Sequence, residues 1–138
     1  MGQIKITRKL LDNYRKYQRE IPLLEYELNE LWMTEKGLGN STILDYQTGF
    51  PRPQSVVGFD CEQYRRRKAA LQARKDNVEA VEKWINAIED GQTRCVFRMF
   101  YIDGMSWVKI AQKTGYSKSP DYPRLYIRDT YLKSQGIN

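Results

Sequence analysis

The sequence contains no histidine and only two cysteines, Cys61 and Cys95. The absence of histidine excludes Ser-His and Cys-His nucleophile pairs and every histidine general base, and it removes most types of zinc site. Two cysteines are too few for a metal site built from cysteine, and without a secretory signal they fit a reducing cytosol better than a disulfide scaffold. No carboxylate pair accompanies a glycine-rich phosphate loop or a metal-type spacing. We therefore predict a protein that is not an enzyme and that uses no cofactor or metal.

Long apolar runs are also absent. None approaches the roughly 20 residues that a membrane span requires. The N-terminus lacks the charged and apolar regions of an export signal, and Ile6 stands where a myristoylation signal has Ser or Thr. We expect a cytoplasmic protein without a membrane partner.

Acidic residues are fewer than basic ones. The 138 residues include 23 Lys and Arg against 17 Asp and Glu, which gives a net charge of +6. This excess favours a polyanionic partner such as nucleic acid. The length fits one compact domain, or a small domain with an appendage.

The first segment, residues 5–35, has apolar residues at alternating spacings of 4 and 3, which predicts a long helix with one apolar seam. Pro22 is expected to kink this helix or split it near Glu20 and Ile21. The seam fits packing within the domain as well as self-association, and the pattern leaves both open. Its members are Leu10, Tyr14, Tyr17, Ile21, Leu24, Leu28 and Leu31.

A segment rich in glycine and proline, residues 36–60, follows, and no regular helix should cross it. A second long helix is predicted over 61–89, with Arg67 and Arg74 at the weaker positions of its seam. Two seams of matching length joined by one loop predict an antiparallel helical pair. We therefore expect residues 1–90 to form a helical oligomerisation part, with a homodimer as the simplest state. The second seam consists of Tyr64, Leu71, Val78, Val81, Ile85 and Ile88.

The second long helix also carries a basic run, "YRRRKAALQARK", with no acidic residue in it. Such a run is typical of a solvated face, and a phosphate-binding surface is the alternative. The residues of this secondary basic patch are Arg65, Arg66, Arg67, Lys68, Arg74 and Lys75.

The final part, residues 91–138, divides into three short helices. The first is predicted over 93–102. Ser106 should cap the second, residues 107–114, and Gly115 should end it. The third should begin at or just before Pro123, because proline is tolerated only in a first helical turn, and should end near Ser134.

The spacing from Ala111 to Gly115 indicates a helix-turn-helix. Such a motif has a small residue where its two helices cross and, four residues later, a glycine that takes a positive φ. We therefore predict an all-α fold in which a long antiparallel helical pair precedes a three-helix helix-turn-helix module. Asp121, six residues after the glycine, departs from the apolar residue that is usual there.

Charge supports DNA binding by this module. Residues 91–138 hold eight basic and three acidic residues, a net +5 of the total +6. Candidates for reading bases lie at the start of the third helix and on its exposed side: Lys118, Ser119, Tyr122, Arg124 and Arg128. Candidates for phosphate contacts are Arg94, Ser106, Lys109 and Lys113.

The order of long helix, linker and basic helix, followed by "FYIDGMSWVKIAQKTGYS", resembles the small phage and prophage transcription regulators of the RinA and ArpU type. Their C-terminal module is similar to the region 4 helix-turn-helix of bacterial sigma factors. The resemblance implies an oligomeric activator of late phage genes in the bacterial cytoplasm, with double-stranded DNA and RNA polymerase as partners. The segment "SKSPDYPRLYIRD" departs from the plainer recognition helix of that group.

Two alternatives stay open. Small terminase subunits of phages also combine a helix-turn-helix with an oligomerising helical part, so a DNA-packaging role fits the same layout. A helical module that binds only protein, such as host polymerase or another host factor, is the other alternative.

Overall fold

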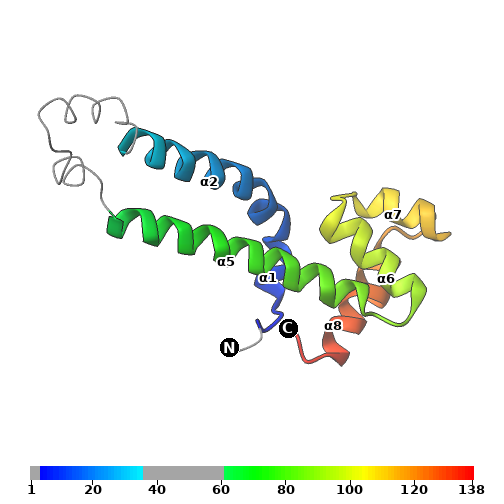
Figure 1. The fold of residues 1–138 in the computed structure, drawn as a ribbon. Helices are drawn as coiled ribbons and strands as arrows, with labels where there is room; N and C mark the ends of the chain where they lie inside the picture. The colour runs from blue at the N-terminus through cyan, green and yellow to red at the C-terminus, as the bar shows by residue number, and fades with distance from the viewer. Residues whose placement is uncertain (1–3, 36–60) are drawn as a thin grey trace, which may run out of the picture. The chain divides into compact units, whose positions relative to one another are not determined.

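The computed structural model describes residues 4–35 and 61–138, and every regular element in these residues is helical. The all-α prediction is confirmed. The predicted irregular linker, residues 36–60, lies outside the described residues. In chain order the elements are α1 (Arg8–Asp12), α2 (Tyr14–Glu35), α5 (Cys61–Asn86), α6 (Gly91–Phe97), the π-helix η1 (Arg98–Ile102), α7 (Trp107–Thr114), the π-helix η2 (Pro123–Asp129) and α8 (Thr130–Ser134) (Figure 1).

The chain forms two compact units. We call Arg19–Lys75 the helical hairpin, and Met1–Gln18 together with Asp76–Asn138 the main unit. Both boundaries fall inside long helices, so α2 and α5 each contribute residues to both units.

In the helical hairpin, α2 and α5 are antiparallel. Glu20, early in α2, accepts a hydrogen bond from Nε of Arg74 at 3.0 Å, whereas Trp32, late in α2, packs against Tyr64 with ring centroids 5.5 Å apart. Figure 1 shows the two helices side by side. The predicted antiparallel pair is confirmed.

The predicted seam of α2 faces inward within the hairpin. Its members there, Ile21, Leu24, Leu28 and Leu31, are all half-buried, whereas most of the residues between them are exposed. Leu71 of the α5 seam is buried.

Pro22 does not split α2. The helix is continuous from Tyr14 to Glu35, so the predicted break near Glu20 is wrong. Pro22 lies on the exposed side of the helix, where water can hydrogen-bond the carbonyl group that loses its backbone donor. The chain breaks instead at Asn13, whose side-chain amide donates to the Lys9 carbonyl oxygen at 2.9 Å and closes α1.

The core of the main unit is closely packed. Val81 and Ile85, from the predicted seam of α5, are fully buried, as is Phe97 of α6. The Tyr14 hydroxyl donates a hydrogen bond to the Glu82 carboxylate, and burial together with this bond raises the pKa of Tyr14. The start of α2 and the end of α5 are thereby joined inside this unit.

Candidate nucleic-acid interface

The first helix of the C-terminal module consists of α6 and η1. Asp90 caps α6 by accepting hydrogen bonds from the Thr93 backbone N–H at 2.9 Å and the Thr93 hydroxyl at 2.8 Å, and both bonds lower the pKa of Asp90. The wide last turn closes where the Asp103 N–H donates to the Arg98 carbonyl oxygen at 2.9 Å. The helix predicted over 93–102 is therefore present and ends in π form at Ile102.

Gly104 follows this helix with a φ of +71°. A Cβ atom at Gly104 would lie 2.5 Å from the Arg15 guanidinium carbon. Both the backbone conformation and the close approach of Arg15 therefore require glycine.

The second helix, α7, has the predicted ends. The Lys109 N–H donates to Ser106 Oγ at 3.2 Å, which caps the first turn. Gly115 takes the left-handed conformation at φ +90°, and the next residue, Tyr116, donates its N–H to the Ala111 carbonyl oxygen at 2.8 Å. Ala111 is fully buried. The Ala111–Gly115 spacing thus forms the turn that the sequence predicts.

Two tight turns lead into the third helix. Ser119 donates its N–H to the Tyr116 carbonyl oxygen at 2.8 Å, and Tyr122 donates to the Ser119 carbonyl oxygen at 2.9 Å. Helical structure begins at Asp121 and continues through η2 and α8 to Ser134, as predicted. Pro123 is buried in the first turn, where its missing N–H breaks no helical hydrogen bond.

A single core cluster joins the three helices. Val96 of α6, Ile110 of α7 and Ile127 of η2 are its buried members. Because each comes from a different helix, their packing fixes the helix-turn-helix arrangement. The cluster is covered by Met99, Phe100, Met105, Trp107 and Tyr116.

Arg128 is not an exposed base-reading residue, and that prediction is wrong. Its side chain is buried, with 7% relative exposure. Its guanidinium lies 5.3 Å from the ring centroid of Phe100 and 5.1 Å from that of Trp107, two rings that stack on each other at 4.2 Å. The stacked rings offer a buried cation the electron-rich face that it prefers. Arg128 therefore stabilises the core of the module.

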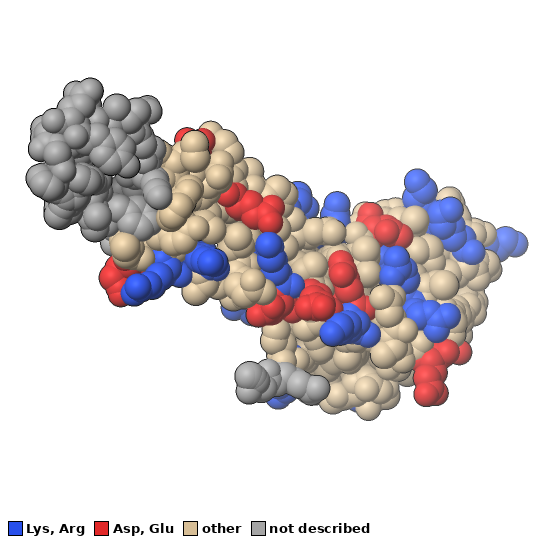
Figure 2. Space-filling view, viewed as in Figure 1, with Lys and Arg blue, Asp and Glu red and all other residues tan. Residues whose placement is uncertain are grey.

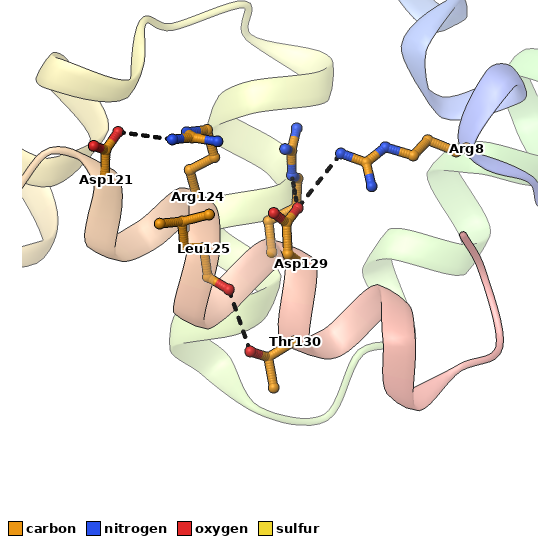
Figure 3. A network of polar contacts seen from close by, with 7 residues as sticks. Arg8, Asp121, Arg124, Leu125, Asp129 and Thr130 are labelled. Carbon is orange, nitrogen blue, oxygen red and sulfur yellow. Dashed lines mark hydrogen bonds and ion pairs between the residues drawn. The ribbon is translucent and has the colours of Figure 1, made fainter.

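Asp129 completes the setting of Arg128. Arg128 Nε donates to Asp129 Oδ1 at 2.8 Å, and Arg8 of α1 pairs with the same oxygen at 3.4 Å (Figure 3). Burial raises the pKa of Tyr101, and the nearby positive charge of Arg128 opposes that rise. The carboxylate thus links α1 to the third helix within the main unit.

The other base-reading candidates gather at the start of the third helix. Lys118 and Ser119 are exposed in the turn. Tyr122 is partly exposed, and its ring stacks on that of Tyr116 at 4.2 Å. Arg124 is half-buried and forms an ion pair with Asp121 at 3.0 Å (Figure 3).

The phosphate candidates differ in how freely they can act. Lys109 and Lys113 are exposed on α7. Ser106 is exposed, but its Oγ accepts the capping hydrogen bond. Arg94 is half-buried and donates to the Ile88 carbonyl oxygen at 2.8 Å, which holds α6 against the end of α5. Of these four candidates, the two lysines are the better placed to contact phosphate.

An exposed apolar face was missed from the sequence. Leu125 and Tyr126 lie on the outside of η2, with Tyr126 at 63% exposure and its ring 5.1 Å from that of Tyr122. The spacing of Tyr122, Leu125 and Tyr126 is the signal for a shared helical face.

The secondary basic patch is half neutralised. Three of its six residues form ion pairs with α2: Arg67 with Glu27, Arg74 with Glu20 at 3.0 Å, and Lys75 with Glu25 at 3.1 Å. The three others, Arg65, Arg66 and Lys68, are exposed and form no ion pair with a described residue. Figure 2 shows acidic and basic side chains interspersed on the face that it presents.

Over residues 4–35 and 61–138, no group of three potential metal-ligating side chains lies together. None of the helices in those ranges is long and apolar enough to cross a membrane. Comparison of the chain with protein-family models, curated proteins and solved structures found no match. The module's own residues are therefore the basis for assigning a function.

Proposed function

We propose that this protein is a transcription regulator that binds specific double-stranded DNA sequences through α7, the following turn and the third helix of its module. The observation that carries the proposal is the formed helix-turn-helix, in which Ala111 is buried and Gly115 is left-handed, with Lys109, Lys113 and Lys118 exposed around it. Cations at these places match the two needs of the motif, which are phosphate contacts and base contacts.

The residues take different roles in this proposal. A recognition helix points its amino-terminal end at base edges while the helix before it crosses the phosphate backbone. Lys118, Ser119 and Tyr122 lie at that end, and Lys109 and Lys113 are one turn apart on the preceding helix. We assign base contacts to the first set and phosphate contacts to the second.

Arg124 can join the first set. Its ion pair with Asp121 is partly exposed, with side-chain exposures of 36% and 69%. Pairs of this kind contribute about 0–1 kcal/mol, so a DNA base or phosphate can displace the carboxylate at little cost.

The biological setting of the proposal comes from the resemblance to phage and prophage regulators. It places the protein in the bacterial cytoplasm, activating late phage genes near a promoter, with RNA polymerase as a further partner. A small terminase-like packaging subunit is the related alternative, because the same module would serve it.

A genome-wide DNA pull-down with the purified full-length protein tests the proposal. We expect enrichment of a short region upstream of a promoter, and a footprint there that Lys118→Ala weakens more than it weakens binding to random duplex. A footprint at a packaging start would select the packaging role. Loss of all DNA affinity even at low salt would contradict both.

A protein-binding module is the second candidate, because Tyr122, Leu125 and Tyr126 form an exposed apolar face on the third helix. Exposed apolar faces mark protein contacts more often than phosphate contacts. Leu125→Ser tests it: capture of RNA polymerase should fall while binding to random duplex stays unchanged. Unchanged capture of polymerase would remove this candidate.

A further inference from the structure

The outer face of α2 carries a second heptad stripe. Arg19, Leu23, Tyr26, Glu30 and Met33 follow one another at spacings of 4, 3, 4 and 3, and all five are exposed. We call this set the outer stripe. None of its members belongs to the inner seam, which faces α5 in the hairpin. A helix with two heptad stripes on different faces has room for two partners.

The middle of the outer stripe is strongly apolar. Leu23 is 67% exposed, Tyr26 66% and Met33 55%. Single exposed apolar residues are ordinary, but three large ones at heptad spacing on one helix form the seam that a second helix covers. The stripe extends over about 21 Å at 1.5 Å per residue, which is long enough for a helix–helix contact.

The two charged members identify the partner. Arg19 lies toward the start of the stripe and Glu30 toward its end, and neither forms an ion pair with a described residue. When a second copy of α2 lies antiparallel with Leu23 opposite Tyr26 of that copy, Arg19 comes opposite Glu30 of that copy. Two-fold symmetry repeats both contacts.

A parallel arrangement has the opposite electrostatics. It places Arg19 opposite Arg19 and Glu30 opposite Glu30, and like charges at facing positions are destabilising. The stripe is therefore complementary to itself in the antiparallel direction only.

We propose that the outer stripe binds a second copy of this chain in an antiparallel, two-fold symmetric contact, with Leu23 against Tyr26 and Arg19 against Glu30 of the other copy. This surface differs from the inner seam, which already packs on α5. The contact forms whether or not the main unit binds DNA, so its test is separate from that of the proposed function.

Charge reversal in the full-length protein tests the contact. The unmodified protein should sediment as a dimer at tens of micromolar, a range suited to one helix–helix contact. Arg19→Glu and Glu30→Arg should each weaken dimerisation about tenfold or more, because both symmetric contacts become like-charge contacts. The double variant Arg19→Glu/Glu30→Arg should restore dimerisation, because opposite charges face each other again.

Cysteine cross-linking tests the direction. Cys61 and Cys95 are exposed and free, so both are first replaced by Ser. In that background, a mixture of Leu23→Cys and Tyr26→Cys chains should form the disulfide-linked dimer faster than either chain alone. Ala70→Cys, an exposed position on α5, is the control and should not cross-link.

Three results would overturn the proposal. The first is a strict monomer at tens of micromolar. The second is a dimer that neither single charge reversal weakens. The third is a double variant that stays monomeric while its circular dichroism matches that of the unmodified protein. Faster cross-linking of each single cysteine variant with itself would show a parallel contact and would also contradict it.

Discussion

The main unit and the helical hairpin bury their apolar residues to different degrees. In the main unit, Ile85, Phe97 and Ile110 are completely inaccessible to solvent. Among the described residues of the hairpin, only Leu71 is buried, and the inner seam of α2 is half-exposed. Two helices alone cannot enclose a core, so the hairpin depends on further contacts more than the main unit does.

The two units also use basic residues differently. In the hairpin, Arg67 and Arg74 lie on the seam and pair with α2 carboxylates. In the main unit, Lys109, Lys113 and Lys118 point to solvent. The function of a basic residue is therefore set by the acidic groups opposite it, which lie far away in the sequence.

The largest effect should come from the core of the main unit. Leu132 is 1% exposed, so Leu132→Ala should lower the free energy of unfolding by about 2–5 kcal/mol through lost burial and the cavity that remains. Leu24→Ala removes the same atoms from the half-exposed seam of the hairpin and should cost roughly 1 kcal/mol. Urea unfolding followed by circular dichroism measures both. Equal losses would remove the contrast between the units.

Arg128→Ala should have the next largest effect. It removes the cation from the Phe100 and Trp107 rings and leaves Asp129 paired only with Arg8. We expect a loss of about 2–3 kcal/mol, below the range for a fully buried pair, because the Asp129 side chain is 33% exposed. Arg128→Lys keeps the charge and should lose less. Thermal unfolding of both variants at neutral pH gives the comparison, and an unchanged melting temperature for Arg128→Ala would restore this residue as a surface group.

Gly115→Ala should destabilise the turn by about 1–2 kcal/mol. Nothing lies within 4 Å of a Cβ atom built at Gly115, so the cost arises from the left-handed backbone at φ +90°. Gly91→Ala is the matched control, since Gly91 begins α6 without a positive φ and its Cβ would stay 3.7 Å from Arg94. The control should be neutral or slightly stabilising in the same unfolding assay. A neutral Gly115→Ala would mean that the turn is not held in this form.

The smallest effect concerns alkaline pH. Burial and the hydrogen bond to Glu82 raise the pKa of Tyr14 above its ordinary value of 10.0. Above pH 10 the unfolded chain loses this proton while the folded chain keeps it, so stability should fall as pH rises. Tyr14→Phe should show a shallower decline than the unmodified protein above that pH. Parallel curves from urea titrations at pH 9 to 11, about one unit on either side of the ordinary value, would contradict it.

Local signals in the sequence predicted the module well. The cap at Ser106 and the left-handed Gly115 depend on residues within one helical turn, and the structure has both. The start of the third helix follows from the restricted backbone of Pro123 alone. Where the chemistry is local, the sequence contains the needed information.

The errors concern contacts between distant residues. The burial of Arg128 depends on a ring stack contributed by η1 and α7, which no pattern around residue 128 reveals. The basic run at 65–75 contains no acidic residue, so its pairing with Glu20, Glu25 and Glu27 emerges only when α2 lies against α5. Pro22 interrupts no helix because its position is exposed, and this too depends on which face packs.

Two triple variants of equal charge change test the central claim most directly. One replaces Lys109, Lys113 and Lys118 of the main unit by Ala, and the other replaces Arg65, Arg66 and Lys68 of the hairpin. Both remove three positive charges, so a general charge effect would be the same for each. Circular dichroism and sedimentation would confirm that both variants keep the fold and the assembly of the unmodified protein.

The measurement is the affinity of each full-length variant for a random DNA duplex across a salt series. The variant of the main unit should bind weakly, with its salt dependence reduced by about 2–3 in the slope of log affinity against log salt, since each lost phosphate contact removes about 0.9. The hairpin variant should keep the affinity and the slope of the unmodified protein. If instead the hairpin variant loses binding while that of the main unit retains it, the DNA surface lies on α5 and the helix-turn-helix module is not the DNA-binding part of this protein.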